Sequence, residues 1–208
     1  MTQENFKAIL KDFVAYDYKE SLGALTEMFK SQPKKVKYMY VVAGPNGSGK
    51  STLIANLYKK HAMAEHYINA DLVARDLKQR IPNERERNMI AMRYTTHAVQ
   101  RHIEEGESFV YETVLSHPSK LDIVRKAKEN GYTVVSYFVC TKSPKINVER
   151  VAMRVEQGGH DVPKDKIISR YHRSVENGKE LKALSDEFYA FDNSLDLNAK
   201  MQEELSRE

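Results

Sequence analysis

The stretch "YMYVVAGPNGSGKSTLIANLY", residues 38–58, decides the fold of this chain. It begins with a run of β-forming residues, continues through a glycine-rich turn, and ends in a helical pattern. The turn matches G-x-x-x-x-G-K-[ST], with Gly44, Gly49, Lys50 and Ser51 at the fixed positions. Because a strand precedes this motif and a helix follows it, the stretch predicts a P-loop that binds a nucleotide triphosphate.

The residues of this loop have distinct expected roles. The glycines let backbone N–H groups point at the phosphates, and the helix that begins near Lys50 adds the positive end of its dipole. Lys50 can reach the β- and γ-phosphates, the Ser51 hydroxyl can ligate Mg²⁺, and Thr52 is placed for the α-phosphate. The alternative is a glycine-rich turn that only caps a helix. The expected nucleotide-binding residues are Gly44, Pro45, Asn46, Gly47, Ser48, Gly49, Lys50, Ser51 and Thr52.

The composition fits one soluble α/β domain. The 208 residues are 41% hydrophobic and 30% charged, and the net charge is +4. This mild, scattered charge suits an anionic ligand but does not argue for nucleic acid. No apolar stretch approaches the roughly 20 residues of a membrane span. The N-terminus lacks a basic region followed by an apolar run, so we expect no secretory signal. The single cysteine, Cys140, lies in an apolar pattern, so we expect a buried thiol and a cytoplasmic location.

Strand and helix patterns alternate from Tyr38 onward. Such alternation predicts a parallel sheet covered by helices on both faces, with strand 38–43 at its centre. Residues 1–35 carry apolar positions at helical spacing, and we separate them as an N-terminal helical extension of a domain over 36–208. The predicted strands are 38–43, 66–69, 106–113, 132–141 and 187–194, and the predicted helices are 50–61, 71–80, 82–105, 117–131, 144–157 and 163–184.

The absence of other signatures narrows the class of P-loop protein. A GTPase should carry D-x-x-G and N-K-x-D, an ABC ATPase should carry an L-S-G-G-Q-like signature, and a motor ATPase usually has four apolar residues before Asp-Glu. None of these occurs in the sequence. What remains is the small-kinase pattern, in which the protein supplies positioning, Mg²⁺ and positive charge for phosphoryl transfer. A nucleotide-binding switch or ATPase without transfer and a kinase acting on nucleic-acid ends remain as alternatives.

Two carboxylates are expected at the carboxyl ends of strands, where ligands bind in open α/β folds. Asp71 follows the strand at 66–69 and could take a proton from a substrate hydroxyl. Alternatively, Asp71 caps the helix that begins there. Glu112 and Thr113 end another strand and are expected to point into the same cleft. Glu112 could bind substrate hydroxyls or hold a Mg²⁺-bound water, or it could simply face solvent.

Arginines late in the chain predict a lid over the phosphates. Arg150 and Arg154 are four residues apart, so they share one face of a helix. Their guanidinium groups suit the charge that develops on a phosphoryl group, although a surface role is the alternative for each. A Gly-Gly hinge follows them at 158–159. The further candidates for this lid are His160, Arg170 and Arg173.

Together these motifs resemble the zeta-toxin-like P-loop kinases over about residues 38–194. The resemblance rests on "AGPNGSGKST", "INAD", "YETVLS", "GGHDVP", "RYHRS" and "FYAFDNS". It implies an adenylate-kinase-like core with an arginine-bearing lid, ATP and Mg²⁺ as cofactors, and phosphorylation of a hydroxyl on a small molecule. In characterised toxin members that molecule is a UDP-N-acetyl sugar.

The resemblance also implies roles for individual residues. Lys50 would hold the phosphates, Asp71 would be the base, an arginine within 150–154 would contact the triphosphate, and Asn69, Glu112 and Thr113 would meet the substrate. The toxins carry a second phosphate-contacting arginine before a "VP"-type segment. This chain has Gly159 or His160 there, and Arg170 or Arg173 could replace it.

The resemblance leaves the role of segment 1–35 open and suggests a protein partner. The segment lies outside the resemblance and could pack on the core or block the site, as an antitoxin helix would. Besides a small-molecule substrate, the expected partners therefore include an antitoxin protein.

Overall fold

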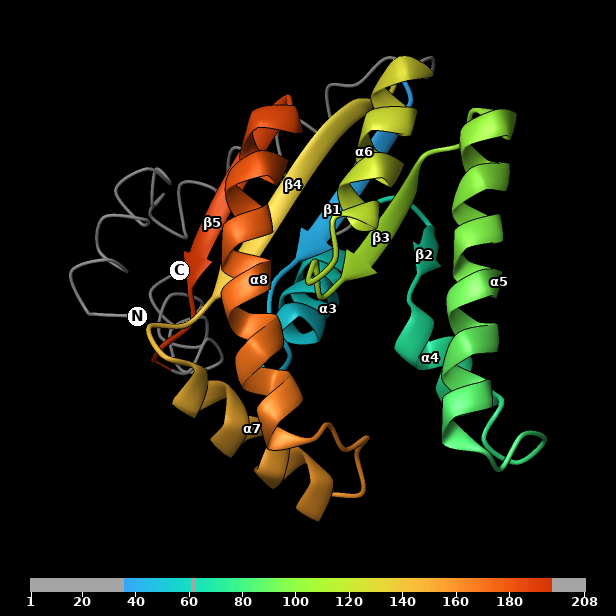
Figure 1. Cartoon of the computed structure of the whole chain (residues 1–208). Coiled ribbons are helices and arrows are strands. Elements are labelled where there is room, and N and C mark those ends of the chain that lie inside the picture. Colours follow the sequence, from blue (N-terminus) through green and yellow to red (C-terminus); the bar gives the residue numbers. More distant parts are fainter. Residues whose placement is uncertain (1–35, 61–62, 196–208) are drawn as a thin grey trace.

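The computed structural model describes residues 36–60 and 63–195 (Figure 1). Segment 1–35, for which the sequence predicts helices, lies outside these residues, so that prediction and the boundary at 35/36 stay predictions. No helix within the described ranges is long and apolar enough to cross a membrane.

A five-stranded parallel sheet forms the centre of the described fold. Its order is β2-β3-β1-β4-β5, and β1 pairs with β3 on one side and with β4 on the other. The predicted α/β class with a central first strand is therefore confirmed. The strands are β1 (Tyr38–Ala43), β2 (His66–Ile68), β3 (Phe109–Thr113), β4 (Thr133–Cys140) and β5 (Glu187–Asp192).

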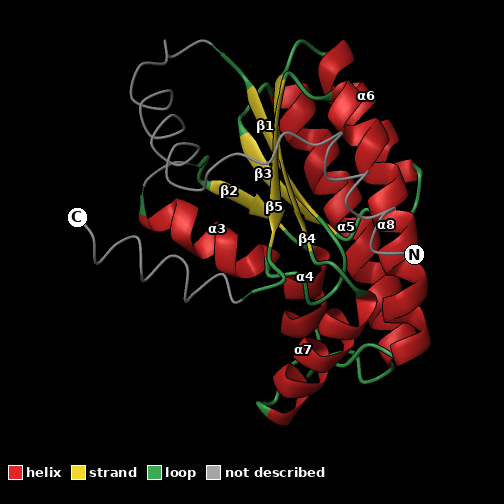
Figure 2. Cartoon of the chain, turned by 90° about the vertical axis from the view of Figure 1, so that its left-hand side faces the viewer, coloured by secondary structure: helices red, strands yellow, loops and turns green. Residues whose placement is uncertain are grey.

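Helices cover both faces of the sheet, as predicted. Helix α3 (Lys50–Lys59) lies on one face, and α5 (Glu84–Glu105), α6 (Ser119–Glu129) and α8 (Lys164–Leu184) lie on the other (Figure 2). Helices α4 (Ala70–Asp76) and α7 (Pro144–Glu156) lie towards the carboxyl ends of the strands (Figure 1).

Helix α4 is shorter than the predicted helix over 71–80. The chain continues from Leu77 to Arg80 as hydrogen-bonded turns, with Arg80 N donating to Leu77 O at 3.1 Å. Residues 78–80 are exposed, so no apolar packing extends the helix. Proline at position 82 also disfavours the helical conformation at Ile81.

Alternation along β1 divides the core between the two faces. Met39 and Val41 pack on the side of α5, α6 and α8, whereas Tyr40 and Val42 pack with Leu53 and other residues of α3. This follows from the two-residue period of a strand.

The thiol of Cys140 belongs to the core, as expected. Cys140 is 2% exposed, and burial raises the pKa of its thiol to about 12.

Candidate active site

The loop after β1 forms a phosphate cradle whose shape depends on glycine. Gly44 and Gly49 have φ angles of 148° and 100°, a region that side chains disfavour. Space is also short, because a Cβ on Gly49 would lie 2.3 Å from Asn193 Nδ2. Lys50 begins α3 and is 7% exposed, and its Nζ donates to the carbonyl oxygens of Gly44 and Pro45 at 2.9 Å each.

The Lys50 ammonium has hydrogen bonds to neutral carbonyls but no close anion. Burial lowers the pKa of Lys50, Glu112 and Asp71 act in the opposite direction, and Arg154 adds to the lowering. Both predicted carboxylates and one predicted lid arginine are therefore among the charged groups that act on Lys50. A desolvated cation of this kind is suited to bind phosphate oxygens.

Two asparagines, neither of them among the predicted site residues, donate hydrogen bonds to carbonyl groups of the P-loop. Asn193 Nδ2 donates to Ser48 O at 2.8 Å, and Asn147 Nδ2 donates to Asn46 O at 2.6 Å. Both asparagines are buried. Asn193 lies in the "DNS" segment that carried part of the resemblance, whereas Asn147 lies inside α7 and gave no signal. Helix α7 and the segment after β5 therefore fix the carbonyl groups of Asn46 and Ser48.

Replacing Asn193 by alanine should lower the free energy of unfolding by about 1–3 kcal/mol, because the buried carbonyl of Ser48 loses its partner. Denaturant titration measures this change, and calorimetry should show weaker binding of ATP. Asn130→Ala is the control, because Asn130 is exposed at the end of α6 and does not contact the loop. Equal stability of the two variants would contradict the clamping role.

The two arginines of α7 have donors without a protein partner. Arg150 Nη1 and Arg154 Nε are buried and donate to no described residue, while Arg154 Nη2 donates to His160 O at 2.6 Å. Helix α7 packs against the loop, since a Cβ on Gly47 would lie 2.7 Å from Asn147 O. Unpartnered buried donors on a helix that packs against the phosphate cradle fit the oxygens of a triphosphate.

Asn69, not Asp71, caps helix α4. The Asn69 Oδ1 accepts hydrogen bonds from Asp71 N at 2.7 Å and from Leu72 N at 3.4 Å. The alternative interpretation of Asp71 as the cap is therefore wrong, because the cap position belongs to the residue two places earlier. The Asp71 side chain is exposed, in the first turn of α4, and lines the cavity described below. It is free to meet a ligand.

Glu112 is held in place and does not simply face solvent. Its Oε2 accepts hydrogen bonds from the Tyr67 hydroxyl and from Asn69 Nδ2, the latter at 2.8 Å. Its Oε1 lies 3.5 Å from the Ser51 hydroxyl. Burial raises the pKa of Tyr67 and the Glu112 carboxylate raises it further, so the phenol remains a donor. Asn69 thus links the carboxylate of Glu112 to the helix that carries Asp71.

No sequence motif indicated a role for Tyr67, and Tyr67→Phe tests its role as a positioning residue. A hydrogen bond to a charged group contributes about 1.5–3 kcal/mol, so we expect the kinase reaction predicted from the sequence to slow on the order of tenfold or more. Steady-state kinetics should show the loss mainly in kcat. Tyr58→Phe is the matched control, since the Tyr58 hydroxyl donates to Ala64 O at 2.8 Å and not to Glu112. Wild-type kcat in Tyr67→Phe would rule out this role.

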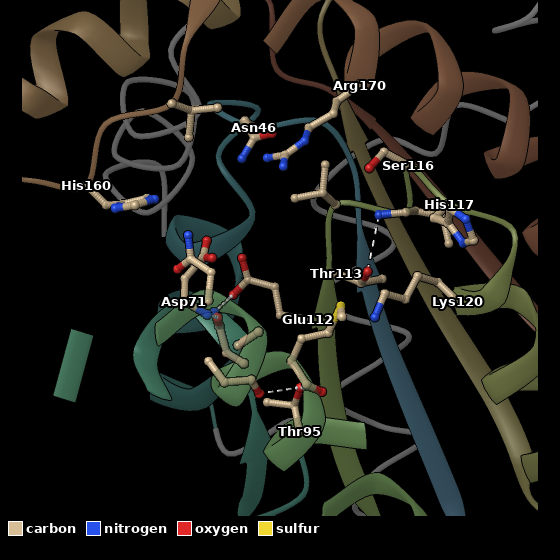
Figure 3. Close-up of a pocket in the computed structure, with 18 of the residues that line it drawn as sticks. Asn46, Asp71, Thr95, Glu112, Thr113, Ser116, His117, Lys120, His160 and Arg170 are labelled. Carbon is tan, nitrogen blue, oxygen red and sulfur yellow. Dashed lines mark hydrogen bonds between the residues drawn. The ribbon is translucent and has the colours of Figure 1, made fainter. Parts of the chain in front are cut away.

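A cavity of about 560 Å³ is shared by the P-loop lysine and the two carboxylates. Lys50, Asp71, Glu112 and Thr113 all line it, as the sequence predicted for a shared cleft. Figure 3 shows Lys120 and Arg170 pointing into the same space. The charged and histidine residues of its lining are Lys50, Asp71, Glu84, Glu112, His117, Lys120, His160, Asp161, Lys166 and Arg170.

The predicted lid residues do not all reach this cavity. His160 and Arg170 line it, whereas Arg150 and Arg154 lie outside its lining. Arg173 also lies outside the lining and is exposed on α8. Of the two candidates for a second arginine, Arg170 is therefore the one placed at the cavity.

The residues present fit ATP and Mg²⁺. The glycine cradle, the Lys50 ammonium and the unpartnered donors of Arg150 and Arg154 suit a triphosphate. Ser51 and Glu112 offer the oxygen ligands that Mg²⁺ prefers.

Solved structures share this fold at low sequence identity. A Chloroflexus aurantiacus protein described as a candidate kinase has a TM-score of 0.56 at 14% identity, covering 84% of this chain and 97% of that one. The PezAT toxin–antitoxin system of Streptococcus pneumoniae gives 0.59 at 17% identity, covering 85% and 78%. AvrRxo1-ORF1:-ORF2, solved with ATP, gives 0.52 at 17% identity, covering 78% and 52%.

Sequence comparison adds a curated relative and a family. An uncharacterized protein of Haemophilus influenzae is 31% identical over 130 residues, which span 62% of this chain and 88% of that protein. The family model described as zeta toxin matches residues 22–194, so the match begins within the segment that the sequence analysis set apart. The chain therefore belongs to the zeta toxin family, whose fold is that of the P-loop kinases.

Proposed function

We propose that this protein is an ATP-dependent kinase that transfers the γ-phosphate to a hydroxyl group of a small molecule. The observation that carries the proposal is that Lys50 of the P-loop and the carboxylates of Asp71 and Glu112 line one cavity. A phosphate-binding cation and a free carboxylate that share a space can bring a phosphoryl donor and a hydroxyl acceptor together.

The side chains divide the work of transfer. Lys50, Arg150 and Arg154 bind phosphate oxygens, and Asp71 orients the acceptor hydroxyl and takes its proton. Tyr67 and Asn69 hold Glu112, which with Ser51 would hold Mg²⁺. When bound, Mg²⁺ neutralises charge on the phosphates. No covalent intermediate on the protein is needed, because positioning and electrostatics carry this reaction.

The cationic residues in the lining of the cavity favour an acceptor molecule that carries negative charge. Lys120, Lys166 and Arg170 line it on the side formed by α6 and α8. Burial lowers the pKa of Lys120, and no carboxylate opposes this effect. A hydroxylated molecule with a phosphate or diphosphate group would satisfy these cations, and a UDP-N-acetyl sugar has this chemistry.

The test uses the full chain with γ-labelled ATP, Mg²⁺ and a metabolite extract, and then with a UDP-N-acetyl sugar as a pure acceptor. We expect a labelled small molecule and an equal amount of ADP, and Lys50→Met should produce neither. Release of free phosphate without a labelled metabolite would support an ATPase instead. Binding of ATP without turnover would support a switch module, and label on RNA ends would support a nucleic-acid-end kinase.

An antitoxin partner is a further part of this proposal. Its support is the likeness to a toxin–antitoxin system, together with exposed methionines on α5 beside the cavity. Met89 and Met92 are 44% and 50% exposed, and Met92 lines the cavity. A partner seated there would block the acceptor, so co-purification with a protein that inhibits labelling is the expected result.

A further inference from the structure

Three side chains with metal-binding atoms meet at the end of the sheet opposite the P-loop. His66 begins β2, His102 lies near the end of α5, and Glu107 lies in the connection to β3. In the sheet, His66 is level with Phe109, and Phe109 is level with Met39 near the start of β1. Because the P-loop follows the other end of β1, this cluster is separate from the phosphate cradle.

The spacing of the donor atoms is close to that of a metal site. One donor atom from each residue lies within 4.8 Å of the others. Glu107 Oε2 lies 2.7 Å from His102 Nδ1, in a hydrogen bond that a bound metal ion would replace, and 3.8 Å from His66 Nε2. Ligands at 2.0–2.2 Å around a tetrahedral ion are about 3.3 Å apart, which falls between these two distances. His66 and Glu107 are both partly exposed, so their side chains have room for the small adjustment needed.

The backbone that carries two of the three residues is fixed in advance. The Tyr132 hydroxyl lies 2.5 Å from His102 O and 2.9 Å from Glu107 O, and Glu107 N donates to His102 O at 3.0 Å. The buried ring of His102 stacks on Phe109 with centroids 5.7 Å apart. A ligand that binds here therefore does not have to order the backbone of these two residues or the ring of His102.

We propose that His66, His102 and Glu107 form a binding site for Zn²⁺ or a similar borderline divalent cation. Two imidazoles and one carboxylate favour Zn²⁺ over Mg²⁺, and water would complete a tetrahedral set on the exposed side. The site is distinct from the Mg²⁺ of phosphoryl transfer, and it does not depend on the proposed kinase function.

The position of the site indicates a structural effect. It joins the start of β2 to the end of α5 and to the segment before β3. Strand β2 carries Tyr67 and leads directly to Asn69, and both residues hydrogen-bond to Glu112. A metal ion bound at His66 would therefore stabilise the position of β2. A metal ion that binds the folded state but not the unfolded state raises the melting temperature by mass action.

The experiment titrates Zn²⁺ into the full chain after removal of any affinity tag and treatment with a chelator. We expect one high-affinity Zn²⁺ per chain by calorimetry, a visible absorption band of tetrahedral Co²⁺, and a higher melting temperature with Zn²⁺. His66→Gln and Glu107→Gln should each weaken binding on the order of tenfold or more. His102 is left intact, because its burial makes substitutions there a risk to folding.

His97→Gln is the matched control, since His97 is an exposed histidine on the same helix outside the cluster. It should bind Zn²⁺ as the wild type does. The proposal is wrong if the wild type binds no stoichiometric Zn²⁺, or if His66→Gln and His97→Gln bind it equally well.

Discussion

Replacing Lys50 by methionine should reduce phosphoryl transfer by on the order of 10²–10³-fold or more, because the reaction loses a preorganised cation at the developing phosphoryl charge. The same change should leave the melting temperature unchanged or slightly higher. The Lys50 ammonium is buried with only carbonyl partners, and burial already disfavours its charged form. Methionine keeps the volume of the side chain and removes that desolvated charge.

The two readouts separate a ligand-binding role from a structural one. Labelled ATP measures transfer, and thermal unfolding without nucleotide measures stability. Lys59→Met is the control, because Lys59 is an exposed lysine of the same helix. A fall in melting temperature as large as that of a core truncation would mean that Lys50 supports the fold, contrary to our interpretation.

Replacing Asp71 by asparagine should lower kcat by about 10²–10⁴-fold, the usual contribution of a general base. Asparagine keeps the size and polarity of the side chain but cannot take the acceptor's proton. The stability of the fold should hardly change, because Asn69 caps α4 and the Asp71 side chain is exposed.

Asp76→Asn is the matched control, since it removes an exposed carboxylate from the last turn of the same helix. Affinity for ATP should be nearly equal in both variants and in the wild type. Turnover of Asp71→Asn within a few-fold of the wild type would show that another group accepts the proton. A large loss in both variants would indicate a general effect of charge rather than a base at position 71.

Much of the candidate site could be predicted because its residues follow strand ends. Parallel strands place their carboxyl ends at one edge of the sheet, so Lys50, Asp71, Glu112 and Thr113 were expected together, and all four line the cavity. The lid was predicted less well. A helical repeat identifies arginines on one face, but it does not tell which face meets a cavity. Arg170 lines the cavity, whereas Arg173 is exposed outside its lining.

The supporting residues could not be found in the same way. Asn193 contacts Ser48 across 145 positions of sequence, and Asn147 contacts Asn46 across 101. Neither asparagine stands in a pattern that names its partner. Tyr67 was read only as a strand residue, yet its hydroxyl binds Glu112 45 positions later. Such contacts depend on which strands become neighbours in the sheet. The local periodicity of the sequence does not predict that spatial order.

The sequence by itself determined the phosphate cradle and the succession of strands and helices along the chain. Both depend on interactions between residues a few positions apart: glycine conformations, a helix start, and alternation of apolar side chains. The tertiary structure alone decided that Tyr67 and Asn69 hold Glu112, and that His66, His102 and Glu107 meet. These arrangements arise only when the sheet assembles in the order β2-β3-β1-β4-β5 and brings side chains from distant strands and helices within hydrogen-bonding distance.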